Sequence, residues 1–181
     1  INGKNQGKRT KDLTVTAENS ADSASIADFK RQKRYRLMWM DTKYESGTVK
    51  VVAYNEKGDA VAEKEIHTAG KPDHIELVAD RNEIKADGKD LSFVTVRVVD
   101  KEGNLCPDAQ HLIKYAVKGA GTYRAGANGD PTSLELFHVP QMKVFNGMMT
   151  AVVQSTDKPG EITLTATGKG LKSGRLVLIS K

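Results

Sequence analysis

The sequence is almost devoid of cysteine, since Cys106 is the only one among 181 residues. A single thiol excludes an internal disulfide and a cysteine-based zinc site. No apolar run approaches the roughly 20 residues of a membrane-spanning helix, and the polar start of the chain, positions 1 to 4, lacks the apolar core of a signal peptide. Aromatic residues make up only 6% of the chain, so we expect no exposed aromatic row of the kind that binds polysaccharides.

Motifs of catalytic chemistry are also missing. The sequence contains no G-x-S-x-G elbow for a serine nucleophile. Residues 119–130 (GAGTYRAGANGD) are rich in glycine but lack dinucleotide-binding spacing, and we interpret these glycines as turn and bulge formers. Cys106 precedes Pro107 without a nearby histidine, which indicates a buried, inert thiol. No local metal-ligand pair exists, because none of the histidines lies three or four residues from another: His67, His74, His111 and His138. We therefore predict surface histidines and no catalytic, cofactor-binding or metal-binding residues.

The excess of positive charge is local. The chain has 28 basic and 23 acidic residues, and five of the basic ones fall within KRQKRYR at 30–36. Such a cluster could attract nucleic acid, but Tyr35 is its only aromatic residue for base stacking. The favoured interpretation is a solvated lead-in to a buried strand, with no nucleic-acid partner.

Period-2 alternation dominates the sequence. Between positions 161 and 167, Ile162, Leu164 and Ala166 share one face while glutamate and threonine share the other. The same pattern predicts further strands at Tyr35–Met40, Thr48–Tyr54, Val61–His67, Ile75–Ala79, Leu91–Val99, Leu112–Val117, Met148–Ser155 and Arg175–Ile179. Turn residues at short intervals then favour an all-β sandwich.

Two connections are near copies, AYNEKGDAV at 53–61 and VVDKEGNLC at 98–106. Each predicts a short hairpin with a bulge, in which the glycine adopts the left-handed conformation. A calcium loop at 100–104 is disfavoured because the ligand spacing is absent. Asn2-Gly3 is a strong hairpin signal with only Ile1 before it, so we expect an N-terminally truncated domain.

The organisation predicted along the chain is two domains that meet in TAGKPD at 68–73, where Gly70 and Pro72 interrupt the alternation. In the second domain we expect a core that includes Val94, Val96, Val98, Ile162, Leu164 and Ala166. Residues 14–34 predict a mobile surface insertion with a short helix. Trp39 is interpreted as core, and the alternative is a sugar-stacking platform together with Tyr44.

Two segments resemble a known family. YRLMWMDTKYESGTVKVVAYNEKGDAVAEKEIHTAGKP is similar to the domain that follows the catalytic barrel in glycoside hydrolase family 2 enzymes, chiefly β-galactosidases of Bacteroides type. ADGKDLSFVTVRVVDKEGN, NGDPTSLE and FNG resemble the immunoglobulin-like domain that ends those enzymes. The likeness covers about 35–171. The stretch from Leu13 to Lys33 is longer than the usual connection, and the turn at 43–47 lacks the proline that the family often carries.

The resemblance implies an all-β fold of two antiparallel β-sandwich domains. The first, 1–70, is a truncated sandwich with an insertion at about 14–34, and the second, 71–181, is immunoglobulin-like with a Greek key. It also implies a non-catalytic accessory role, because no residue matches the family's two catalytic glutamates. The expected partner is the catalytic barrel of the parent chain, with carbohydrate as a further candidate. We expect no cofactor and no membrane span, a monomeric fragment, and a periplasmic or extracellular bacterial parent.

Overall fold

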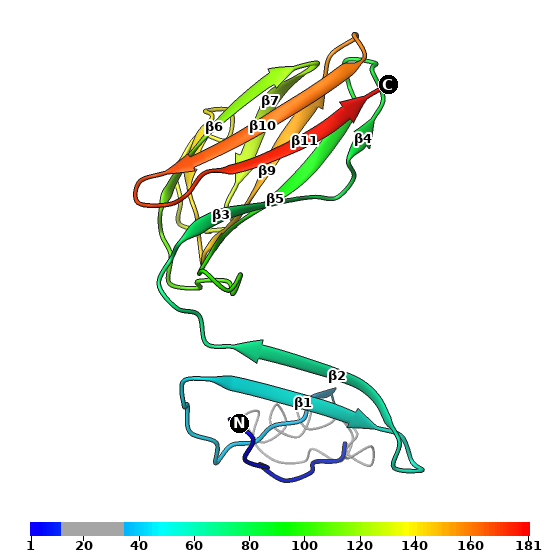
Figure 1. Cartoon of the computed structure of the whole chain (residues 1–181), viewed down its shortest axis with the longest axis vertical. Helices are drawn as coiled ribbons and strands as arrows, with labels where there is room; N and C mark the ends of the chain where they lie inside the picture. Colours follow the sequence, from blue (N-terminus) through cyan, green and yellow to red (C-terminus); the bar gives the residue numbers. More distant parts are fainter. Residues whose placement is uncertain (12–34) are drawn as a thin grey trace, which may run out of the picture. The chain divides into compact units, whose positions relative to one another are not determined.

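The computed structural model describes residues 1–11 and 35–181, which form two compact units, Ile1–Thr68 and Ala69–Lys181 (Figure 1). The predicted insertion with its short helix lies outside the described residues, as does most of the basic segment 30–36. Within the described part of the chain, no helix has the length and hydropathy needed to cross a membrane. The two units are described separately below.

The second unit is a β-sandwich of two sheets (Figure 1). One sheet is antiparallel and has the strand order β3 (His74–Ala79), β5 (Leu91–Val99), β9 (Met148–Ser155), β7 (Gly121–Ala127). The other has the order β4 (Glu83–Ile84), β11 (Gly174–Ser180), β10 (Gly160–Gly168), β6 (Leu112–Gly119), β8 (Gln141–Lys143). The short β4 pairs parallel to β11, which departs from a purely antiparallel sandwich. From β3 to β10, consecutive strands alternate between the two sheets, so each connection passes from one sheet to the other.

The core of this unit is the predicted one. All six residues expected there have no exposed surface: Val94, Val96, Val98, Ile162, Leu164 and Ala166. They alternate with exposed or half-buried polar residues, as in Thr163 and Thr165 of β10. Tyr115 of β6 and Tyr123 of β7 stack with ring centroids 5.6 Å apart, which joins the two sheets. Burial on one face of each sheet is what the period-2 pattern predicts.

In the first unit, the strands among the described residues are β1 (Thr48–Tyr54) and β2 (Ala60–His67), which pair antiparallel. Opposed residues share a face, and one face carries the apolar residues Val49, Val51, Ala53, Ala62 and Ile66 together with Lys64, which lies opposite Val51. Val51 is 49% exposed and Ile66 is 58% exposed, so this apolar face is largely uncovered. An isolated hairpin of this kind is only marginally stable in water.

The predicted turns are confirmed. Asn2 and Gly3 both have positive φ, 47° and 77°, and the Lys4 amide donates to the Ile1 carbonyl at 2.7 Å, as in a hairpin turn with two left-handed residues. In the two near-copies, Gly58 and Gly103 have φ of 89° and 85° and donate to the carbonyls of Asn55 and Asp100. A bulge at Ala53/Tyr54 accompanies the first copy.

The prediction of a strand at Tyr35–Met40 is wrong, because residues 36–39 have no regular secondary structure. Alternation of Leu37 and Trp39 with polar or smaller residues was its only signal, and these residues instead line a groove. The sequence did not predict β4, β7 or β8. Strand β7 contains Gly121 and Gly126, and only at 119 and 129 do glycines of this stretch adopt positive φ. The expectation of turn and bulge glycines is therefore confirmed only in part.

Candidate functional site

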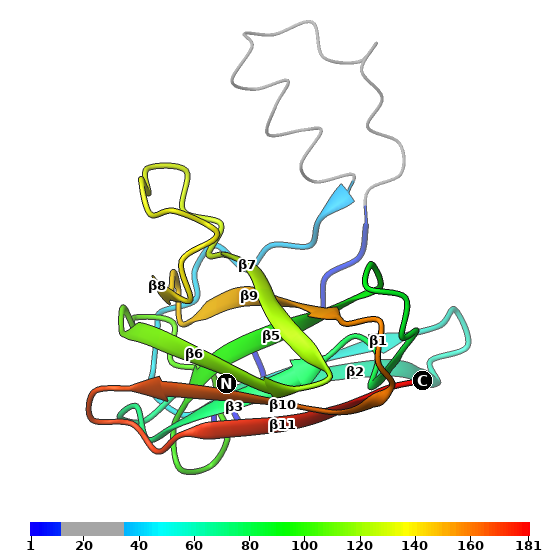
Figure 2. The ribbon, with the colours of Figure 1, turned by 90° about the horizontal axis from the view of Figure 1, so that it is seen from above.

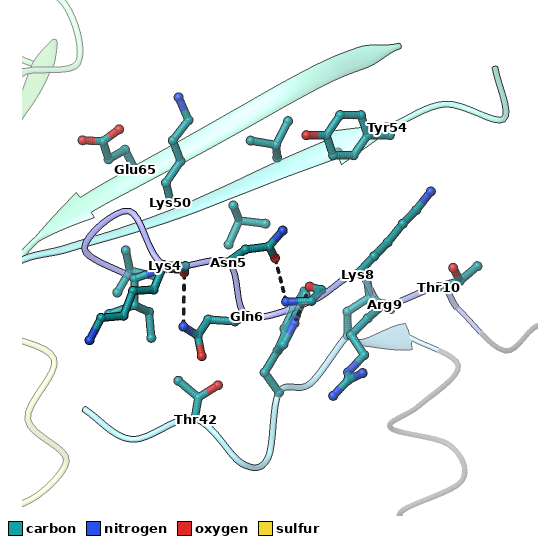
Figure 3. Close-up of a pocket in the computed structure, with 18 of the residues that line it drawn as sticks. Lys4, Asn5, Gln6, Lys8, Arg9, Thr10, Thr42, Lys50, Tyr54 and Glu65 are labelled. Carbon is teal, nitrogen blue, oxygen red and sulfur yellow. Dashed lines mark hydrogen bonds between the residues drawn. The ribbon is translucent and has the colours of Figure 1, made fainter. Parts of the chain in front are cut away.

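A groove lies in the first unit, between the N-terminal segment 1–11 and strand β1 (Figure 3). Trp39 and Leu37 also line it, together with Glu65 of β2. The N-terminal segment is held beside β1 by the Asn2 amide, which donates to the Thr48 carbonyl at 2.9 Å, and by the Asn2 side chain, which accepts from the Thr48 amide at 2.7 Å. The Trp39 indole N–H donates to the Gly7 carbonyl at 3.0 Å and so also holds this segment.

Positive charge predominates among the described residues that line this groove. Its basic lining residues are Lys4, Lys8, Arg9, Lys11 and Lys50, and its acidic ones are Glu56 and Glu65. The Lys8 ammonium lies 6.0 Å from the centre of the Tyr54 ring, a cation–π distance. Lys50 forms an ion pair with Glu63 at 2.9 Å, and the hydrogen bond and charge of Glu63 raise the pKa of Lys50.

Glu56 and Glu65, the two carboxylates among the described lining residues, are far apart. Glu56 lies in the turn between β1 and β2, whereas Glu65 pairs with Lys50 near the opposite end of the hairpin. Five residues of strand separate Glu65 from Ala60, the first residue of β2 after the turn. At about 3.3 Å per residue this is a distance of about 17 Å. The two catalytic carboxyl groups of a glycosidase lie roughly 5 to 9.5 Å apart, so the described residues that line this groove do not provide such a pair.

In the second unit, Asp100 is the most strongly bound carboxylate. It is 2% exposed and accepts hydrogen bonds from the amide of Gly70 at 2.7 Å, the amides of Glu102 and Asn104, and the Asn104 side-chain amide. The Gly70 bond is the largest cause that lowers the pKa of Asp100 to about 2, against the opposing effect of burial. Four N–H donors saturate this carboxylate, so it closes the turn and ties it to Gly70.

Other carboxylates of the second unit also accept hydrogen bonds that lower their pKa. Backbone amides of Lys89 and Asp90 lower the pKa of Asp87, and the Lys85 amide together with Arg81 lowers the pKa of Asp90. Two further carboxyl groups have a lowered pKa. Hydrogen bonds and charge from Lys172 and His74 lower the pKa of Asp73, and hydrogen bonds from Thr132 lower the pKa of Asp130. Among the described residues, every resolved carboxyl shift is downward. A general acid requires the opposite shift.

The histidines lie where the sequence placed them, at strand ends and in loops: His67, His74, His111 and His138. His67 contacts Thr48 at 3.1 Å and Glu65 at 3.2 Å, and His74 contacts Asp73 at 3.1 Å. Within residues 1–11 and 35–181, no group of three His, Cys, Asp or Glu residues could hold a metal ion. Cys106 is buried, 4% exposed, and burial raises the pKa of its thiol, as do the charges of Asp100 and Asp108. The predicted buried thiol is confirmed.

The two aromatic residues considered for sugar stacking are not brought together. Trp39 is half-buried in the groove, whereas Tyr44 is 80% exposed, does not line the groove, and lies 3.3 Å from the Thr68 hydroxyl through its own hydroxyl. The basic lining residues 4 to 11 were not predicted from sequence. The Asn2-Gly3 turn was the only sequence feature that pointed to this segment. A turn alone does not predict that residues 4 to 11 lie beside β1.

Comparison with known proteins agrees with these features. Residues 75–177 match the family model described as glycoside hydrolase family 2 C-terminal domain 5, and residues 1–62 match a domain of unknown function (DUF4982). The chain is 46% identical over 176 residues to the β-galactosidase BoGH2A of Bacteroides ovatus, a match that covers 97% of this chain and 18% of the relative. It is 32% identical over 134 residues to a β-galactosidase of Thermoanaerobacter pseudethanolicus, covering 74% of the chain and 16% of that relative.

A solved structure is similar as well. A glycosyl hydrolase family 2 member from Bacteroides cellulosilyticus superposes with a TM-score of 0.72 at 35% identity, over 77% of this chain and 18% of that one. The chain thus spans less than a fifth of the length of each of these relatives. It belongs to the glycoside hydrolase family 2 C-terminal domain 5 family and is homologous to the non-catalytic C-terminal region of family 2 glycosidases.

Proposed function

We propose that this chain is an accessory region of a β-galactosidase-like family 2 enzyme and performs no hydrolysis itself. The parent cleaves a β-galactoside or a related β-linked sugar through a catalytic barrel that this chain does not contain. The relatives from Bacteroides support an exported, periplasmic or extracellular bacterial enzyme. The chain contributes structure next to the barrel.

The observation that carries this proposal is the state of the carboxylates. A retaining glycosidase needs one ionised carboxylate and one protonated carboxyl group close together. In the described residues, every carboxyl pKa with a resolved shift is lowered by amide, hydroxyl or cationic partners, which favours the charged form. The two in the groove lie too far apart for this chemistry. The arrangement supports structural turns and not proton transfer.

For the domain organisation, we propose that residues 1–70 belong to a larger β-sandwich that follows the barrel, and that 71–181 form an immunoglobulin-like domain. The uncovered apolar face of β1 and β2 supports the first part, since such a face is stable when a second sheet covers it. The strand alternation between two sheets supports the second part.

Activity measurement on the purified chain tests the proposal. We expect turnover of nitrophenyl β-galactoside no faster than a buffer blank, because on this proposal the barrel and its carboxylate pair belong to the rest of the parent enzyme. The parent enzyme, assayed alongside, should release nitrophenol. Turnover by the isolated chain that a point substitution within it abolishes would refute the accessory role.

A carbohydrate-binding module is the second candidate, and the observation in its favour is that Trp39 and Tyr54 line the same groove. Trp39 is the only tryptophan, so its fluorescence reports on the groove alone. Because Trp39 is half-buried and its indole N–H is bonded to the Gly7 carbonyl, we expect no saturable change in emission when galactan or xylan is added. A saturable shift that is lost in Tyr54→Ala would favour the binding module over the accessory role.

A further inference from the structure

The connection between β7 and β8 carries an apolar protrusion at its centre. Leu134 is 95% exposed, Leu136 is 61% exposed and Phe137 is 60% exposed. These three residues, called the 134–137 tip below, fall within four positions of one another. Figure 2 shows the yellow segment after β7 standing away from the two sheets of the sandwich. Single exposed apolar residues are common, but a cluster of large ones marks an interaction surface.

The connection is held in place by polar contacts. At its start, Asp130 accepts hydrogen bonds from the amide and the hydroxyl of Thr132, at 2.8 and 2.7 Å. At its centre, the Glu135 carboxylate accepts from the Lys143 amide of β8, at 3.2 and 3.3 Å to its two oxygens. The Asn128 side chain donates to the Lys143 carbonyl at 3.0 Å.

The tip itself is anchored to β7. The Phe137 carbonyl accepts from the Gly126 amide at 2.8 Å and from the Tyr123 hydroxyl at 3.3 Å. The Val139 amide donates to the Leu136 carbonyl at 3.2 Å. The backbone is therefore fixed while the three apolar side chains face outward. Preorganisation of this kind lowers the entropy lost on docking.

The charges of the connection do not compete for the docking surface. Both carboxylates, Asp130 and Glu135, are turned toward amides of their own connection and of β8. The tip is thus neutral and apolar, which suits a dry contact with folded protein. It lacks the exposed aromatic row or the basic cluster that a polysaccharide or an anionic surface requires.

The size of the tip selects the kind of occupant. Three such side chains expose on the order of 400 Å². A stable interface between free proteins needs about 800 Å² from each partner. A second copy of this chain would contribute only the same small tip. A covalently linked partner needs far less area, because the linkage supplies a high effective concentration, and the relatives place more than four-fifths of their length outside the region matched here.

We propose that the 134–137 tip docks the second unit onto the catalytic region of the same polypeptide in the parent enzyme, and so fixes the position of the sandwich relative to that region. This inference rests on the proposed accessory function. The occupant is a folded protein surface with an apolar recess that accepts two leucines and one phenylalanine.

Amide hydrogen exchange over residues 133 to 138 tests the docking, measured in the parent enzyme and in the isolated chain. We expect exchange in the parent to be slower by about tenfold or more, because the recess excludes water from the tip. Equal exchange in the two proteins overturns the proposal. Protection in the isolated chain that grows with concentration also overturns it, since that result assigns the tip to a second copy.

A triple variant of the parent, Leu134→Thr with Leu136→Thr and Phe137→Thr, should exchange in this segment at the rate of the isolated chain. The matched control is Val78→Thr with Phe93→Thr, which removes side chains that are 48% and 47% exposed on strands β3 and β5. The control should keep the slow exchange. If the triple variant fails to fold, the comparison of the two native proteins decides alone. Turnover by the isolated chain would sink the accessory function but leaves this comparison readable.

Discussion

Replacement of Leu164 by alanine is expected to lower the free energy of unfolding of the second unit by about 2 to 5 kcal/mol. Leu164 has no exposed surface and lies in the middle of β10, paired with Leu176 of β11 and Val117 of β6. Truncation removes buried apolar surface and leaves a cavity that two hydrogen-bonded sheets cannot close. A loss of this size is a large fraction of the stability of a domain of about 110 residues.

The two units give different spectroscopic signals, so an experiment can show which unit Leu164→Ala destabilises. Trp39 belongs to the first unit, so its fluorescence follows that unit during urea unfolding, while circular dichroism is dominated by the strands of the second. Leu164→Ala should shift only the second signal. Thr165→Ala, one residue along on the half-buried outer face, should shift it by about 0.5 kcal/mol or less. An equal loss in both variants would contradict the assigned core.

Acid should unfold the second unit as pH falls from about 4 toward 2, and Asp100 is the leading cause. Its pKa is about 2 in the folded chain, whereas an unfolded aspartate has a pKa of about 3.9. The folded state therefore binds fewer protons, and stability rises with pH across this window. The contribution of Asp100 is fully present above pH 4 and is lost as pH falls through the folded pKa.

Asp100→Asn should be less stable than the native chain at pH 7 and should show a flatter fall in stability between pH 4 and 2. Some acid sensitivity will persist, because the carboxyl pKa values of Asp73, Asp87 and Asp90 are also lowered. Urea midpoints measured by circular dichroism at half-unit steps of pH give the comparison. Asp157→Asn, at an exposed position before β10, should retain the native profile. An unchanged slope in Asp100→Asn would refute this role.

Sequence alone determined the long strands and their buried faces. Strands β1, β5 and β9 have the predicted bounds, because each carries β-branched or other apolar residues at period 2 over seven or more positions. The two hairpin copies were also readable, since a glycine at a left-handed position is a local requirement. These features depend on neighbours within a few residues, so the chain specifies them without reference to its fold.

Tertiary structure decided everything that depends on distant partners. Strand β7 forms from a glycine-rich stretch because it pairs with β9 about thirty residues later, and its glycines permit close approach. The low pKa of Asp100 depends on an amide thirty residues earlier, at Gly70. Trp39 looked like a core residue, yet it lines a groove because the N-terminal segment returns to β1. The 134–137 tip has an apolar composition that would suit a core strand, and only the fold shows that its side chains face outward. Local periodicity indicates which side of a segment is apolar. Which strand or segment covers that side depends on contacts between residues that are distant in the sequence.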